Sequence, residues 1–180
     1  MDTYKSKWTR LQAGIFRLLS IKAGQRFNLR SVAKLLKVSP TAVSNSLIDL
    51  KKQGIIKVET ARPMNLLSIE LNRENQKVID MKRIENLKMI YESGLVEFLE
   101  ENFPGCTIVL FGSYSKGEDT YKSDLDIAIV GTKGKKIGLE KFEKIFEKTI
   151  NINYYESWNI DKHLRNNILN GIVLSGGVDL

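Results

Sequence analysis

The stretch LFGSYSKGEDTYKSDLDIAIV, residues 110–130, decides the fold of this chain. It contains the end of one apolar run, 107–111, and the whole of a second, 125–130, and each run has the length and composition of a buried strand. The residues between the runs are polar and include glycines, which predicts a turn and the start of a short helix. Asp124 and Asp126 stand where the second predicted strand begins.

The polar segment has the composition of a phosphate-binding turn. Gly112 allows backbone amides to approach a ligand closely. Ser113 adds a hydroxyl group at a predicted helix N-terminus, where phosphate is favoured. Lys116 is a further candidate for phosphate contact, although lysines on loops usually extend into solvent. We therefore expect Gly112, Ser113 and Lys116 to bind a nucleotide.

A different phosphate motif, the P-loop, is excluded. Gly112 and Gly117 have the glycine spacing of that motif. It then requires Lys followed by Ser or Thr, whereas Glu118 and Asp119 stand at those positions.

The two aspartates form a candidate metal site. Alternate residues of a strand share a face, so both carboxylates point the same way, about 6.6 Å apart along the strand. This arrangement suits the binding of metal ions that are themselves about 3.5–4 Å apart. Two neighbouring carboxylates repel each other and are costly to shield from water without a cation. We therefore expect Asp124 and Asp126 to bind Mg²⁺ together with a nucleoside triphosphate, and to be the catalytic carboxylates of any transfer reaction.

With these residues in view, the segment resembles the nucleotidyltransferase superfamily that includes polymerase beta. More narrowly, it is similar to the minimal nucleotidyltransferases of archaea and bacteria, whose signature is Gly-Ser, a short spacer and Asp-x-Asp. Gly112, Ser113, Asp124 and Asp126 match that signature. The resemblance implies an α/β domain with a small mixed sheet over residues 104–180. It also implies transfer of a nucleoside monophosphate from Mg–NTP to a hydroxyl group of a protein, an RNA end or a small molecule.

The strand expected at 149–155 departs from the family pattern. Active members usually take a third carboxylate from this strand, but here its polar face carries Asn151 and Asn153. An amide oxygen can ligate magnesium, yet it adds no charge and cannot act as a general base. Glu156 and Asp161 follow closely and stay open as substitutes. Two hypotheses result: a nucleotidyltransferase, favoured by the signature, or a DNA-binding transcriptional regulator with a degenerate nucleotide sensor, favoured by the asparagines.

The N-terminal part has the order of a DNA-binding domain. Residues 8–54 contain three amphipathic helical patterns, with Asn28 and Ser39 as predicted N-caps of the second and third helices. Two predicted strands, 55–59 and 66–71, follow. This order resembles the winged helix-turn-helix family and implies that the third helix enters the major groove of DNA. The candidate DNA contacts are Thr41, Ser44, Asn45, Lys51 and Arg62.

A long helix is expected to connect the two parts. Its apolar stripe includes Ile84 and Ile90, and Gly94 can kink or divide it. The predicted fold class is therefore α+β. The predicted domains are a winged helix-turn-helix at 1–72, a connecting helix at 73–103 and a nucleotidyltransferase-like domain at 104–180.

Composition restricts the partners. The 180 residues carry a formal net charge of +7 and a pI of about 9.4, which favours a polyanionic partner such as DNA or a nucleotide. The single cysteine, Cys106, forms neither an internal disulfide nor a zinc cluster and is expected in the core. No apolar run has membrane-spanning length, so we expect a cytoplasmic protein without a membrane partner. A homodimer is plausible because winged-helix proteins often bind two half-sites.

Overall fold

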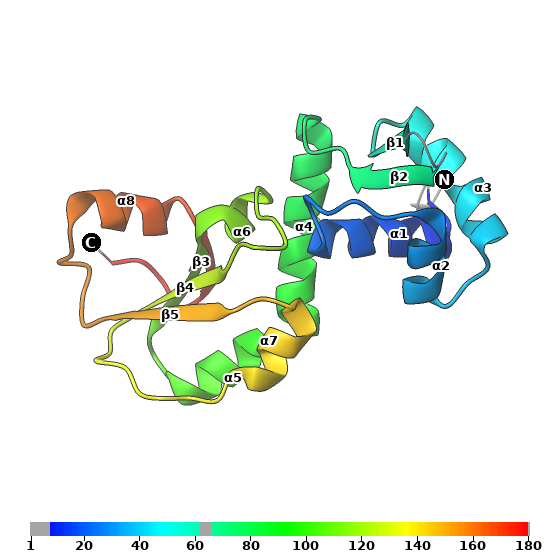
Figure 1. Cartoon of the computed structure of the whole chain (residues 1–180). Coiled ribbons are helices and arrows are strands. Elements are labelled where there is room, and N and C mark those ends of the chain that lie inside the picture. The colour runs from blue at the N-terminus through cyan, green and yellow to red at the C-terminus, as the bar shows by residue number, and fades with distance from the viewer. Residues whose placement is uncertain (1–7, 62–65, 180) are drawn as a thin grey trace, which may run out of the picture. The chain divides into compact units, whose positions relative to one another are not determined.

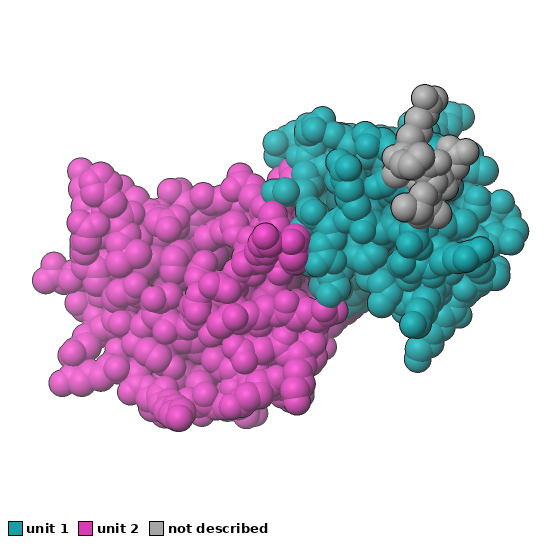
Figure 2. Space-filling view, viewed as in Figure 1, with its two compact units in different colours: residues 1–78 teal, residues 79–180 magenta. Residues whose placement is uncertain are grey.

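The structure, a computed structural model, describes residues 8–61 and 66–179 and divides into two compact units. The first unit is Met1–Val78 and the second is Ile79–Leu180, coloured separately in Figure 2. The boundary falls within a helix, and the three-part division into 1–72, 73–103 and 104–180 stays a prediction.

The first unit has three helices followed by two strands. In chain order they are α1 (Arg10–Ile21), α2 (Leu29–Leu36), α3 (Pro40–Lys52), β1 (Ile56–Ala61) and β2 (Leu66–Leu71). The side chains of Asn28 and Ser39 accept hydrogen bonds from Ser31 N and Ala42 N, so both predicted N-caps are confirmed. These caps satisfy amide groups that the first helical turn leaves unpaired.

The two strands form an antiparallel hairpin with Ile56 opposite Leu71. Phe27, just before α2, pairs with Ile69 of the hairpin through two backbone hydrogen bonds of 2.9 and 2.8 Å. The core beneath is formed by apolar side chains of all three helices and the hairpin, including Ile15, Val43 and Ile69, which are fully buried. A helix-turn-helix followed by a two-stranded wing is a winged helix-turn-helix, as predicted.

The predicted connecting helix is divided. Helix α4 (Gln76–Glu92) ends before Gly94, whose φ of 75° is left-handed, and α5 (Leu95–Asn102) begins directly after it. Ile84, expected on the apolar stripe, is 69% exposed, so that assignment was wrong. The buried face of α4 instead carries two polar residues, Lys82 and Asn86, and apolar periodicity alone therefore placed the face incorrectly.

The second unit is built on a four-stranded mixed sheet. Its remaining elements are β3 (Thr107–Phe111), α6 (Gly112–Lys116), β4 (Leu125–Val130), α7 (Glu140–Phe146), β5 (Ile150–Tyr155), α8 (Lys162–Leu169) and β6 (Ile172–Ser175). The strand order is β5-β4-β3-β6, in which only β4 and β5 are parallel. The apolar residues Ile172–Ser175 form the edge strand β6, which was not predicted from the sequence.

Helices cover both faces of this sheet. Figure 1 shows α8 on one side and α5 and α7 on the other. Helix α8 contributes Ile168 to a buried cluster with Phe111 and Ala128, and α5 contacts α7 through Phe98 and Phe142, whose ring centroids are 5.1 Å apart. Because both faces are covered, β3 is buried along its whole length, as a continuous apolar strand predicts.

Two further side chains of the second unit, Cys106 and Ile145, differ in burial. Cys106 is buried, as expected. Ile145 of α7 is 41% exposed, since this helix buries Phe142 and Phe146. Within 8–61 and 66–179, no helix has both the length and the apolarity needed to cross a bilayer.

Candidate functional site

The candidate site lies where β3 ends and the parallel strands β4 and β5 begin. Phe111, the last residue of β3, is paired with Asp126, and Asp126 is paired with Asn151 of β5. Gly112 therefore follows β3 directly beside Asp126. The sheet brings together Gly112, the two aspartates and an asparagine that lies 25 residues from Asp126 in the chain.

The amide group of Asn151 bridges the two carboxylates. Its Nδ2 donates to Asp124 Oδ2 at 3.2 Å and to Asp126 Oδ1 at 3.3 Å. Asp124 is exposed and Asp126 is half-buried, so the pair faces solvent with the amide between them. Two hydrogen bonds from a neutral donor offset part of the repulsion between the carboxylates without neutralising their charge.

Gly112 fits closely against this group. Its φ is +74°, and a Cβ atom built on it would lie 2.7 Å from Asp126 Oδ2. The position therefore favours glycine both for its backbone conformation and for the space that the carboxylate needs. The Oγ of Ser115 donates to Gly112 O at 2.8 Å and stabilises the first turn of α6.

The other predicted nucleotide-binding residues lie on α6. Ser113 follows Gly112 and is half-buried, whereas Lys116 is the exposed last residue of this helix. The structure therefore places Ser113 next to the aspartate pair along the chain and leaves Lys116 in solvent, where lysine side chains usually lie.

Neither proposed substitute supplies a third carboxylate. Glu156 follows the opposite end of β5 from Asn151 and faces Lys133 at 4.0 Å. Asp161 caps α8 by accepting hydrogen bonds from His163 N and Leu164 N. Over the described ranges 8–61 and 66–179, no group of three His, Cys, Asp or Glu side chains could hold a metal ion.

The donor set nevertheless suits one kind of cation. Magnesium keeps several waters and is commonly bound through one or two carboxylates together with the phosphates of its substrate. Asp124 and Asp126 meet that requirement, and the amide oxygen of Asn151 could add a neutral ligand if its side chain turned. The residues fit one magnesium ion that arrives with a triphosphate better than a metal pair held by the protein alone.

Two tyrosines at the end of β5 that lies away from Asn151 have raised pKa values. Desolvation raises the pKa of the Tyr154 and Tyr155 hydroxyls. The Tyr154 hydroxyl donates to Lys135 O at 2.9 Å, which is consistent with a neutral phenol. Both tyrosines therefore stay protonated at neutral pH.

A buried polar network, which was not predicted from the sequence, lies beside this site. Lys82 and Asn86 of α4, Asp119 of the loop between α6 and β4, and Lys148 before β5 are all buried. These side chains come from three separate segments, so no local pattern marks them. The one available signal was the pair of polar residues at i and i+4 on the predicted connecting helix.

The candidate DNA contacts cluster on α3. Thr41, Asn45 and Lys51 are exposed, and Ser44 is half-buried. Pro40 opens α3, so Thr41, Ser44 and Asn45 lie in its first two turns, the part of a recognition helix that contacts base edges. Arg62 lies outside the described residues.

The geometry of Gly112, Asp124, Asp126 and the mixed sheet agrees with a comparison against protein families. The model of the nucleotidyltransferase domain matches residues 92–173. The matched segment contains Gly112, Ser113, Asp124 and Asp126. The match begins at the end of α4, includes α5 and ends in β6, so it starts before residue 104, where the motif placed the start of the domain.

Solved structures of regulators are similar to this chain at low scores. ZitR of Lactococcus lactis, in a mutant form, is 24% identical with a TM-score of 0.42, covering 57% of this chain and 67% of that one. The adhesin competence repressor AdcR of Streptococcus pyogenes is 22% identical with a TM-score of 0.43, covering 55% and 70%. A mutant ZitR in complex with DNA is 24% identical with a TM-score of 0.40, covering 58% and 68%.

The winged helix of this chain is defined by its own order of three helices and two strands. No curated protein sequence matches the chain.

Proposed function

We propose that this protein is a nucleotide-responsive DNA-binding regulator. Its nucleotidyltransferase domain binds Mg–NTP at Gly112, Ser113, Asp124 and Asp126 but does not transfer the nucleotidyl group. The bound nucleotide then changes the DNA affinity of the winged helix. The observation that carries the proposal is the position of Asn151, whose amide lies between the two carboxylates.

The absence of a general base supports binding without transfer. A hydroxyl acceptor must lose its proton as it attacks phosphorus, and a carboxylate can take that proton whereas an amide cannot. In the described part of the chain, no third acidic side chain joins Asp124 and Asp126. Magnesium, when bound with the triphosphate, would screen the charge of the phosphates. Asp124 and Asp126 would hold the ion, and Gly112 would keep Asp126 in place.

The same amide supports a site that is stable when empty. Two carboxylates on adjacent positions of one strand face repel each other, and Asn151 gives each of them a hydrogen bond. A sensor must fold in both its ligand-free and ligand-bound states, since it can report only a difference between the two. A neutral donor between the aspartates meets this condition and leaves their charge available for a cation.

Exposed residues of α3 support the DNA-binding part of the proposal. Thr41 and Asn45 offer hydrogen-bonding groups suited to base edges, and Lys51 offers a cation suited to phosphate. The net charge of +7 adds a general attraction to nucleic acid.

A second candidate function is nucleotidyl transfer. The close packing of Gly112 on Asp126 favours it, because this is the arrangement that the family signature implies for an active site. In that case the acceptor is a hydroxyl group of a protein, an RNA end or a small molecule.

One experiment separates the two. We would measure ATP and GTP binding with and without Mg²⁺ by calorimetry for the wild type, Asp126→Asn and Asn151→Asp, and assay pyrophosphate release on the same samples. Glu156→Gln is the matched control, since it removes an exposed carboxylate outside the site.

We expect the wild type and the control to bind nucleotide in a Mg²⁺-dependent way. Asp126→Asn should bind the nucleotide about tenfold more weakly or worse, because the charge of one metal ligand is lost. Pyrophosphate release is expected only from Asn151→Asp, where the third carboxylate is restored. Release by the wild type above the Asp126→Asn background would replace the regulator with the enzyme. No Mg²⁺-dependent binding by the wild type would contradict both functions.

A further inference from the structure

Four buried polar side chains lie in or beside the loop that joins α6 to β4, residues 117–124. Lys82 and Asp119 have no exposed surface, Asn86 is 3% exposed and Lys148 is 7% exposed. Lysine is rarely this deeply buried, and two lysines beside one carboxylate are rarer still. The function described so far uses none of the four.

Asp119 is the centre of the network. Its Oδ1 forms an ion pair with Lys82 Nζ and accepts a hydrogen bond from Asn86 Nδ2 at 2.7 Å. Its Oδ2 lies 3.2 Å from Lys148 Nζ, an ion pair without the alignment of a hydrogen bond. One carboxylate thus faces the ammonium groups of two buried lysines.

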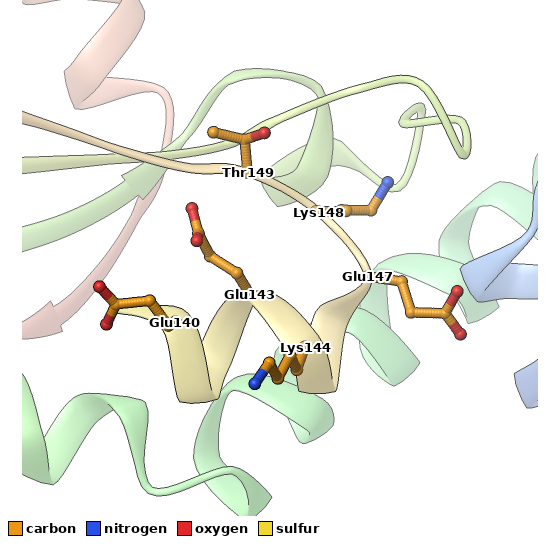
Figure 3. Close-up of a pocket in the computed structure, with 6 residues that line it drawn as sticks. All are labelled: Glu140, Glu143, Lys144, Glu147, Lys148 and Thr149. Atoms are coloured by element: carbon orange, nitrogen blue, oxygen red, sulfur yellow. The ribbon is translucent and has the colours of Figure 1, made fainter. Parts of the chain in front are cut away.

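One of the two lysines, Lys148, also binds the backbone of the loop. Lys148 Nζ donates to Thr120 O at 2.5 Å and to Ser123 O at 3.2 Å. Both ammonium groups also lie 5.9 Å from the centre of the Tyr114 ring, within range of a cation–π interaction. Figure 3 shows Lys148 extending away from Glu140 and Glu143, the acidic residues of α7 that line the neighbouring cavity. Lys148 therefore binds backbone carbonyl groups of the loop 117–124, whose last residue is Asp124.

The loop is held at three places. At its start, Gly117 packs so closely on α4 that a Cβ atom would lie 2.5 Å from Ile79 O and 2.8 Å from Arg83 N. In its middle, Asp119 binds Lys82 and Asn86 of the same helix. At its end, Lys148 binds the carbonyls of residues 120 and 123. Gly112 and Ser113 precede this loop, Asp124 is its last residue and Asp126 follows it on β4, so the loop lies between the phosphate-binding turn and the two aspartates of the candidate site.

Stability alone is a weak reason for such a cluster. Burying an ion pair usually costs about as much as it returns, and well-packed apolar side chains of similar volume often do as well or better. A lysine that donates to two loop carbonyls does something that an apolar side chain cannot, since it fixes the backbone by directed bonds.

We propose that Lys148 is a positioning residue, which holds the loop 117–124 so that Asp124 and Asp126 face the phosphate-binding turn. Lys82 and Asn86 anchor the same loop to α4, the helix that continues from the wing of the first unit. The inference rests on the proposed function for its ligand, although the order of the loop can be measured without one.

The test compares two lysines that both touch Asp119. Lys148→Met removes the bonds to the loop carbonyls and leaves a balanced Lys82–Asp119 pair. Lys82→Met leaves Lys148, Asp119 and the loop carbonyls in place. Lys144→Met, an exposed change on α7, is the control for a lost surface charge. For each protein we would measure hydrogen exchange of the amides of Thr120, Lys122 and Ser123 without ligand, and the Kd for Mg–ATP by calorimetry.

We expect the three loop amides to exchange about tenfold faster or more in Lys148→Met than in Lys82→Met or Lys144→Met, because charge-assisted hydrogen bonds to the loop are lost only there. The Kd for Mg–ATP should rise about tenfold or more in the same variant alone. Should Lys148→Met not fold, Lys148→Gln replaces it; its neutral amide can donate to the carbonyls but without charge assistance, so the same loosening of the loop is expected at a smaller size, and none would overturn the role.

Equal exchange in the Lys148 and Lys82 variants would overturn the positioning role and leave a structural charge cluster. An unchanged Kd with a loosened loop would also overturn it, because the loop would then not position the ligand groups. A wild type that binds no Mg–ATP would remove the proposed function alone, since the exchange rates still decide whether Lys148 holds the loop.

Discussion

At Asn151, an amide group lies where a carboxylate would bring a third negative charge to Asp124 and Asp126. The exchange of one oxygen for an NH₂ group turns an acceptor into a donor, and both hydrogen bonds of this donor end on the aspartates. A site with two charges attracts a divalent cation less strongly than a site with three. We therefore expect that any binding of Mg²⁺ here depends on the nucleotide.

Alanine substitutions at three glycines with left-handed backbones test how the candidate site depends on the close contact between Gly112 and Asp126. Gly105, Gly112 and Gly117 have φ values between 74° and 77°. Alanine at each position should cost about 1–2 kcal/mol of unfolding free energy from the backbone alone. At Gly105 nothing lies within 4 Å of the new Cβ, so the cost should end there.

The other two positions should differ from each other. At Gly117 the new Cβ meets the backbone of α4, which cannot move away, and the loss should be larger, about 3 kcal/mol or more. At Gly112 it meets only the movable carboxylate of Asp126, so stability should fall as at Gly105 while Mg–ATP affinity falls about tenfold. Urea unfolding and calorimetry measure the two effects, and wild-type affinity in Gly112→Ala would show that the place of Asp126 does not matter.

At the scale of elements, α4 shows how a helix with a mixed buried face misleads. Its buried positions include Val78, Lys82, Asn86 and Ile90, spaced at four residues, whereas Ile84 lies on the opposite side. Two polar residues on this row lower its apparent hydrophobicity, and the isoleucine outside it raises that of the exposed face. The buried position of Lys82 on this row is explained by Asp119, which is its partner in an ion pair.

Paired substitutions on α4 check this orientation. Ile90→Ala should lower the free energy of unfolding by about 2–5 kcal/mol, because it leaves a cavity beneath a fully buried side chain. Ile84→Ala should change it by less than about 0.5 kcal/mol, since this side chain is 69% exposed. Urea denaturation of both variants gives the comparison, and similar losses at both positions would contradict the orientation of α4.

At the scale of the whole molecule, the proposed function requires that two ligands affect each other. If Mg–ATP changes the affinity for DNA, DNA must change the affinity for Mg–ATP by the same factor, typically about 5–150-fold. We would measure DNA binding by fluorescence anisotropy on a duplex selected by the protein from a random pool, with and without saturating Mg–ATP. Calorimetry with and without that duplex gives the reverse factor.

Two variants locate the coupling in the expected sites. Asp126→Asn should abolish the effect of nucleotide on DNA affinity while leaving the nucleotide-free affinity unchanged. Lys51→Gln should weaken DNA binding and reduce its log–log dependence on salt by about 0.9 if the side chain neutralises one phosphate. A DNA affinity that saturating Mg–ATP does not alter would end the regulatory hypothesis.

The sequence by itself determined the elements and their order. The caps at Asn28 and Ser39 and the strands β3 and β5 depend on local sequence, and the structure contains each of them where it was expected, although burial along β5 does not alternate. The edge strand β6 was missed because four residues are too few to show a period. The Gly-Ser and Asp-x-Asp spacing also predicted a resemblance to the family whose model matches residues 92–173, since these residues lie within a single short segment.

Only the tertiary structure decided what surrounds the aspartates. It placed Asn151 between them, put Glu156 and Asp161 elsewhere, and joined Lys82, Asp119 and Lys148 into one buried cluster. Lys82 and Asp119 are 37 residues apart, and such pairs are set by the packing of helices on the sheet. A buried charge needs its partner in space, and that partner carries no mark in the local pattern of the chain because burial depends on every layer of the fold at once.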